Sequence, residues 1–122
     1  KQGLAYDDWP AVADFAALAP GLSWTYNYVL APLDPLTGAD FPAAQVEFVP
    51  FLRSFALDDN TVPDLIQGVP AEAAPYLLGF NEPQFFSQDG LSATQAAALW
   101  PQVEAIADSY GAFLISPSGQ QP

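Results

Sequence analysis

Residues 76–83 read Tyr-Leu-Leu-Gly-Phe-Asn-Glu-Pro, a short apolar run that ends in a carboxylate. A continuous apolar run between Pro75 and Pro83 is typical of a strand that is buried on both faces, as in a parallel sheet. In barrel enzymes built on such strands, the reacting groups lie at the C-terminal ends, where side chains leave the packed core. Glu82 therefore stands where a catalytic acid would stand, although its carboxylate could instead accept hydrogen bonds from the following turn.

Apolar runs and helical patterns alternate on both sides of this stretch. Strands are predicted at about residues 3–6, 23–28, 46–52, 76–80 and 112–115, and helices at about 8–19, 59–67 and 91–110. Prolines and Gly38 interrupt residues 29–45, which predicts a loop or a broken helical turn. The alternation predicts an α/β fold with a parallel sheet, and residues 1–122 form a single segment without internal repeats.

Several residues mark where the predicted elements begin and end. Asp8 is the N-cap candidate of the first helix, and either Asp89 or Ser92 is that of the last helix. Gly111 is expected to end the last helix. Pro50 is expected near the end of the third strand, because proline cannot donate a hydrogen bond to a sheet.

The composition narrows the classes of function. Fourteen acidic residues stand against two basic ones, and the net charge is −12. Such a charge repels phosphate backbones and anionic lipid, so we expect neither nucleic acid nor a membrane surface as partner, whereas neutral sugars remain open. We also expect no membrane span, because no apolar stretch approaches the roughly 20 residues that one needs.

The chain contains neither cysteine nor histidine. Disulfides, thiolate metal sites, histidine-dependent triads and the common zinc sites are therefore excluded. We expect no metal and no cofactor. Any chemistry would have to use carboxylates, hydroxyls and amides.

A series of motifs occurs in order along the chain: LAY at 4–6, WTYNY at 24–28, EFVPFL at 47–52, LGFNEP at 78–83, AALWP at 97–101 and LISPS at 114–118. Each motif is weak alone, but the ordered set resembles glycoside hydrolase family 128 from the first residue to about residue 118. That family comprises fungal, plant-associated and bacterial TIM-barrel enzymes that hydrolyse β-1,3-glucans with retention of configuration. The resemblance implies that Glu82 is the general acid/base and that Asn81 contacts the sugar hydroxyl beside the scissile bond.

The same resemblance implies a glucan cleft lined by Tyr6, Trp24, Tyr26, Asn27 and Tyr28. The residues themselves leave some of these roles open. Trp24, Tyr26 and Tyr28 alternate and so share one strand face, which can be packed core or a platform for a sugar ring. Arg53 follows the third strand and could either pair with an acid or orient a ligand.

Three positions depart from the family pattern. Tyr28 stands where a second tryptophan is expected, and Gln84 stands where an aspartate commonly follows Glu-Pro. The third strand ends in Phe-Leu-Arg at 51–53, where the family tends toward Met, Leu and Trp. These changes concern sugar subsites more than the chemistry.

The predicted elements amount to about five β/α units, whereas a TIM barrel has eight in about 250 residues. Retaining hydrolysis needs two carboxyl groups about 5 Å apart, and the resemblance places the second, a glutamate nucleophile, on the seventh strand. Glu47, Glu72 and Glu104 are not placed to serve as that nucleophile. We therefore expect the N-terminal half of a barrel, inactive alone and completed by a second polypeptide produced by cleavage after about Pro122.

The leading hypothesis is thus a secreted, retaining endo-β-1,3-glucanase, with this chain supplying the acid/base and part of the cleft. The alternative is a non-catalytic β-glucan-binding or structural protein that keeps the cleft. A half-barrel completed by copies of itself is disfavoured, because five strands do not double to eight.

Overall fold

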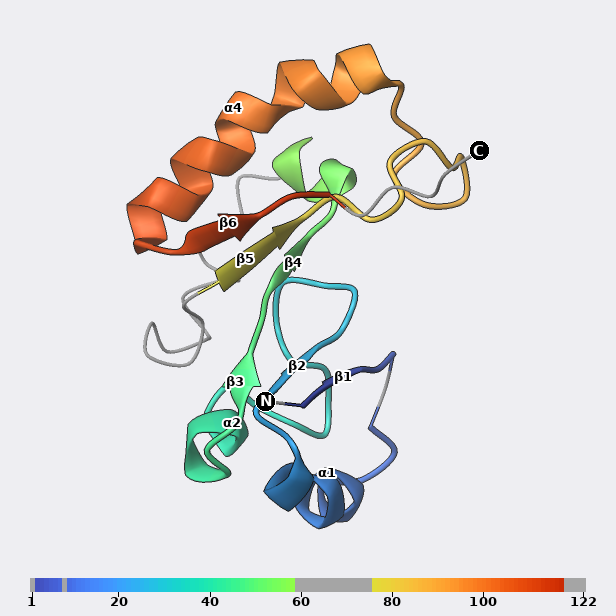
Figure 1. The fold of residues 1–122 in the computed structure, drawn as a ribbon. Helices are drawn as coiled ribbons and strands as arrows, with labels where there is room; N and C mark the ends of the chain where they lie inside the picture. The colour runs from blue at the N-terminus through green and yellow to red at the C-terminus, as the bar shows by residue number, and fades with distance from the viewer. Residues whose placement is uncertain (1, 8, 59–75, 118–122) are drawn as a thin grey trace.

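The computed structural model describes residues 2–7, 9–58 and 76–117, in which parallel strands alternate with helices (Figure 1). The elements are β1 (Gly3–Ala5), α1 (Val12–Leu18), the 3₁₀ turn η1 (Ala19–Gly21), β2 (Trp24–Tyr26), α2 (Asp40–Ala43), β3 (Glu47–Phe48), β4 (Phe51–Leu52), the 3₁₀ turn η2 (Ser54–Asp58), β5 (Tyr76–Gly79), α4 (Ala93–Tyr110) and β6 (Phe113–Ile115). The predicted helix at 59–67 lies outside the described residues.

The strands form two sheets of three, ordered β1-β2-β3 (the N-terminal sheet) and β4-β5-β6 (the C-terminal sheet). Each pairing within them is parallel, with Thr25 of β2 opposite Leu4 and Phe48, and Leu78 of β5 opposite Phe51 and Ile115. The predicted α/β fold with parallel strands is therefore confirmed.

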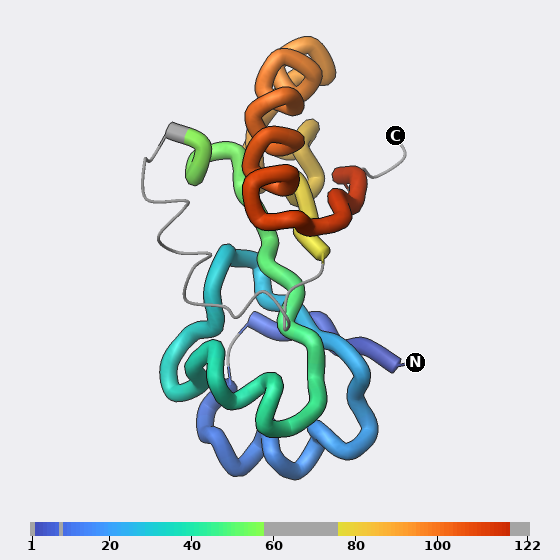
Figure 2. The backbone as a smooth tube through the Cα atoms, turned by 90° about the vertical axis from the view of Figure 1, so that its left-hand side faces the viewer, coloured from blue at the N-terminus to red at the C-terminus, as the bar shows by residue number. Residues whose placement is uncertain are grey.

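The third predicted strand, residues 46–52, divides at Pro50 into β3 and β4 and so joins the two sheets (Figure 2). The Val49 and Phe51 amides donate to the Thr25 and Val29 carbonyls at 2.8 and 3.0 Å, on either side of the proline that has no amide hydrogen. The Pro50 carbonyl still accepts from Leu78 at 2.9 Å. Pro50 thus lies between β3 and β4 and not near the end of one strand, and its neighbours Val49 and Phe51 donate the hydrogen bonds that hold this segment.

One face of each sheet packs against helices. In the N-terminal sheet, Phe48 joins Phe15 of α1 and Phe41 of α2 in a buried cluster. In the C-terminal sheet, a second cluster holds Leu52, Leu77 and Phe80 against Val103 and Ala107 of α4. Burial of this size in each cluster fixes both sheets to their helices, since fully burying one large apolar side chain is worth about 1.5–3 kcal/mol.

The opposite face, which we call the open face, carries the alternating side chains Trp24, Tyr26, Val49, Tyr76, Leu78 and Ile115. These six residues and Glu47 line an apolar hollow of about 300 Å³. The ring of Trp24 stacks parallel to that of Tyr26 at 6.2 Å. Gly3 makes room for it, because a Cβ at Gly3 would fall inside the Trp24 ring.

The ends of α4 follow local signals. The Ser92 hydroxyl accepts from the Gln95 amide while the Gln95 side chain accepts from the Ser92 amide, which forms a capping box. Gly111 ends the helix in a left-handed conformation, as predicted. Of the two N-cap candidates, Ser92 is therefore the cap and Asp89 is not.

The first helix is shorter than predicted. It begins at Val12 after Ala11, which provides no side-chain cap, whereas the sequence predicted a start at about residue 8. Asp8, the predicted cap, lies outside the described residues. No helix in the described ranges has the length and apolarity needed to cross a membrane.

Candidate active site

A cavity of about 540 Å³ opens at the carboxyl ends of the strands. It is lined mainly by polar side chains from residues that end or follow β1, β2, β4 and β5, namely Asp7, Tyr26, Tyr28, Arg53, Asn81, Glu82 and Gln88. Parallel strands that share one direction bring their carboxyl ends to one edge, which is where α/β folds bind ligands. The structure thus brings together five of the predicted site residues: Tyr26, Tyr28, Arg53, Asn81 and Glu82.

Glu82 enters this cavity from a bent main chain. Phe80 and Glu82 have φ of 20° and 41°, on either side of Asn81. The bend turns the Phe80 ring toward α4, where it packs edge-on to Trp100 at 5.8 Å. Backbone of this kind costs about 1–3 kcal/mol per residue and is found most often at functional sites.

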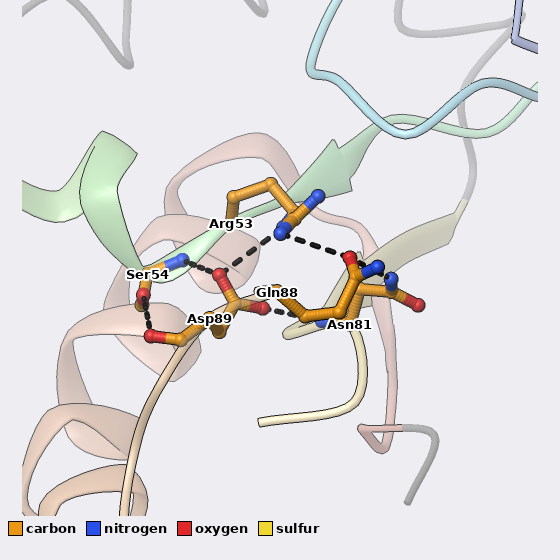
Figure 3. A network of polar contacts seen from close by, with 5 residues as sticks. All are labelled: Arg53, Ser54, Asn81, Gln88 and Asp89. Atoms are coloured by element: carbon orange, nitrogen blue, oxygen red, sulfur yellow. Dashed lines mark hydrogen bonds and ion pairs between the residues drawn. The ribbon is translucent and has the colours of Figure 1, made fainter. Parts of the chain in front are cut away.

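The buried carboxylate of Asp89 binds residues at the ends of two neighbouring strands, among them Arg53 and Asn81 of the cavity lining (Figure 3). The Asp89 side chain is fully buried, and its Oδ1 accepts from Arg53 Nε at 3.1 Å and from the Ser54 amide at 2.8 Å. Its Oδ2 accepts from the Asn81 amide at 2.5 Å. One side chain therefore joins the end of β4 to the end of β5.

Gln88 ties two of the cavity-lining side chains to each other. Its Oε1 accepts from Asn81 Nδ2 at 2.8 Å and from Arg53 Nη2 at 3.3 Å. Of the two roles that the sequence left open for Arg53, pairing with an acid is present, and the same side chain also lines the cavity. The guanidinium additionally lies 5.5 Å from the centre of the Phe55 ring.

The aromatic wall of the cavity consists of Tyr26 and Tyr28. Their rings meet edge-on at 5.6 Å, and both lie within 6 Å of the Phe51 ring. Burial, with Tyr28 nearby, raises the pKa of the Tyr26 hydroxyl above its usual value. A tyrosine is protonated at neutral pH even without such a shift, so the Tyr26 hydroxyl can donate a hydrogen bond. Trp24 is set further back, in the apolar hollow of the open face.

Tyr6 and Asn27, which the resemblance placed in the cleft, do not line the cavity. Tyr6 is 9% exposed and packs on Trp9 at 4.9 Å in the helix-side cluster. Asn27 is fully buried, and its side chain closes a turn by donating to the Ala31 carbonyl at 3.0 Å and accepting from the Val29 amide at 3.3 Å. The inward positions of Tyr6 and Asn27 both follow from strand alternation, which turns every second side chain toward the helices.

Three residues of the site were not predicted as site residues. Asp7 follows β1 as Glu82 follows β5, so its strand-end position was a usable signal that the sequence-based prediction did not use. Asp89 was considered only as a cap of α4. Gln88 lies in the loop after Glu82 and carries no signal that sequence could reveal. No three Asp, Glu, His or Cys side chains in the described part of the chain gather as a metal site would require.

Comparison with known proteins places these features in a family. A family model described as glycosyl hydrolase catalytic core matches residues 3–122. No curated protein matches the sequence. Among solved structures, a family 128 subgroup II endo-β-1,3-glucanase from Sorangium cellulosum is 40% identical, with a TM-score of 0.84, over 97% of this chain and 46% of its own. A subgroup II endo-β-1,3-glucanase from Pseudomonas viridiflava is 34% identical over 98% and 46%, with a TM-score of 0.82.

A subgroup I endo-β-1,3-glucanase from Amycolatopsis mediterranei, solved with laminaritriose, is 26% identical over 98% of this chain and 44% of its own, with a TM-score of 0.71. The chain thus spans about half the length of the structures that it matches. The family-model match covers nearly all of the chain, and the motifs of the resemblance lie in the matched region. The chain belongs to glycoside hydrolase family 128.

Proposed function

We propose that this chain supplies the general acid/base and part of the sugar cleft of a retaining endo-β-1,3-glucanase. The observation that carries the proposal is the position of Glu82, which enters a polar cavity at the end of β5 beside Asn81, Tyr26 and Tyr28. Endo-β-1,3-glucanases are also the solved structures with 40% and 34% identity to the chain.

In the proposed mechanism, the carboxylic acid of Glu82 protonates the oxygen of the scissile glycosidic bond. The leaving sugar departs as the nucleophile attacks the anomeric carbon, and a covalent glycosyl-enzyme forms. The Glu82 carboxylate then removes a proton from the incoming water, which releases the second product with net retention. Asn81 Nδ2 donates one hydrogen to Gln88 Oε1, and its second hydrogen would bind a sugar hydroxyl beside that bond.

We propose further that the described strands are the first part of an eight-stranded barrel and that the nucleophile lies in the part of the barrel that these residues do not include. The matched structures are about twice as long as this chain, which supports a larger fold. The open face supports it as well, because its apolar side chains need a cover. A polymeric glucan also suits the secretion expected from the sequence.

The decisive experiment compares Glu82→Gln with wild type in the protein that contains the complete barrel, using a laminari-oligosaccharide and β-1,3-glucan as substrates. Loss of the general acid should lower kcat by about 10²–10⁴-fold and leave oligosaccharide binding largely intact. Glu104→Gln, an exposed position on α4, is the matched control and should retain activity. Undiminished hydrolysis by Glu82→Gln would refute the role of Glu82, and glucan binding without hydrolysis by the wild type would favour a binding protein.

A further inference from the structure

The buried Asp89 carboxylate does more than close a loop. Removing a charge from water is costly unless donors replace the lost hydration. Here three donors do so: Arg53 Nε, the Ser54 amide and the Asn81 amide. Two of them are main-chain groups at the ends of neighbouring strands, so the carboxylate sets the position of those strand ends relative to each other (Figure 3).

The third donor to Asp89 is the main-chain amide of Asn81, which lies in the bend of the main chain. Asn81 lies between the two residues of positive φ, Phe80 and Glu82, and this conformation persists only where surrounding groups hold it. The Phe80 ring holds the near side of the bend through its contact with Trp100. On the far side, the Asn81 amide is bound to the charged Oδ2 of Asp89, and hydrogen bonds to a charged group are about twice as strong as neutral ones.

The loop that carries Asp89 is itself well ordered by internal hydrogen bonds. The amides of Phe85, Gly90 and Leu91 donate to the carbonyls of Glu82, Phe85 and Pro83 at 2.9, 2.9 and 2.5 Å. The loop therefore returns Asp89 to the strand end from which it departs. Gln88, one residue earlier, reaches the Asn81 side chain.

We propose that Asp89 is the positioning residue of this site: its carboxylate fixes the main chain of Asn81 and so the direction in which Glu82 enters the cavity. The inference rests on the function proposed for Glu82, because its effect on turnover acts through that side chain. Arg53 neutralises the buried charge and is in turn held in the cavity wall.

The test compares Asp89→Asn with Asp108→Asn in the complete protein. An asparagine at 89 has one acceptor oxygen, so in either orientation its amide group faces at least one of the three donors. We expect kcat to fall by about 10–100-fold, as for other supporting residues, with little change in KM. Asp108→Asn makes the same change of charge at an exposed position on α4 outside the cavity, so its kcat should match wild type.

A second measurement does not depend on catalysis. In wild type, the Asn81 amide proton should resonate downfield and exchange slowly with solvent, because it is bound to a charged acceptor. In Asp89→Asn this protection should fall, while that of Leu78, bound to the Pro50 carbonyl at 2.9 Å, should persist.

An unchanged kcat in a folded Asp89→Asn protein, or equal losses in both variants, would overturn the inference. If Asp89→Asn does not fold, the exchange rate of the Asn81 amide proton in the wild type tests the inference. Fast exchange at a random-coil chemical shift would overturn the inference, and slow exchange would support it. If the wild type shows no glucanase activity, the proposed function fails, and the Asn81 amide still decides whether Asp89 holds the strand end.

Discussion

Gly79 keeps α4 close to β5 because it has no side chain. A Cβ at this position would come within 2.8 Å of the Trp100 ring and 3.6 Å of Val103. The same Trp100 ring packs against Phe80, the residue at which the main chain begins its bend toward Glu82. The absence of one methyl group therefore determines how closely α4 packs on β5.

Gly79→Ala should lower the free energy of unfolding by about 1–3 kcal/mol, because the added methyl group forces the Trp100 ring to move within a packed cluster. Urea unfolding followed by tryptophan fluorescence measures the change. Gly21→Ala is the control, since a Cβ at Gly21 meets nothing within 4 Å. Equal stability changes in the two variants would show that the Trp100 contact does not restrain the helix.

Single residues of the site differed in how far sequence could predict them. Glu82 was predictable because a strand end is a local signal, and the order of the elements then placed it at the edge where other strands also end. The role of Asp89 was not, because its partners Arg53 and Ser54 lie 36 and 35 positions away and meet it only through the pairing of β4 with β5. Asn27 could have been placed by alternation, which sets it on the face opposite Tyr26 and Tyr28.

Among the elements, α4 was the one whose boundaries sequence predicted best. The predicted range of 91–110 compares with Ala93–Tyr110, because the capping box and the C-terminal glycine are local signals. The division of the third strand was missed, because it depends on the carbonyls that neighbouring strands offer to Val49 and Phe51. The length of α1 was overestimated, because its start was predicted at about residue 8, whereas the helix begins at Val12 without a side-chain cap.

Ser92→Ala should destabilise the protein by about 1 kcal/mol, since it removes the hydroxyl that accepts from the Gln95 amide. Thermal or urea unfolding monitored by circular dichroism measures this loss. Ser109→Ala is the control within the same helix, because the Ser109 hydroxyl donates only to a carbonyl one turn earlier, at Ile106. A Ser92→Ala protein as stable as wild type would show that tertiary contacts alone fix the start of α4.

Over the molecule as a whole, two helix-side clusters are packed while the open face is not covered by the described residues. Phe113 at the C-terminal edge of the sheets is 71% exposed, and Tyr76 beside it is 40% exposed, with their rings 5.9 Å apart. Contiguous apolar surface of this kind marks a place where another part of a protein packs. The exposure of this apolar surface could be predicted from the number of strands, which is too small to close a barrel. In the proposed barrel, the remaining strands would cover it.

The 122-residue chain alone should bind a hydrophobic dye at the open face, and the protein with the complete barrel should not. Phe113→Ser should reduce dye binding by the isolated chain, because it removes the most exposed ring of that face. Val12→Ser, 43% exposed on α1 away from the open face, is the control. Dye fluorescence measures the difference, and equal fluorescence from the complete protein would contradict the proposed cover.

Because Pro50 has no amide hydrogen, it affects the register in which the strands pair. A shift of residues 47–52 by one position along residues 25–29 would place Pro50 where Val49 or Phe51 now donates, and one hydrogen bond, worth about 1 kcal/mol, would be lost. The same shift would turn the apolar side chains of each face to the other side. Pro50 therefore favours the observed alignment, and a single-residue insertion or deletion between Phe48 and Leu52 would shift either β3 against β2 or β4 against β5.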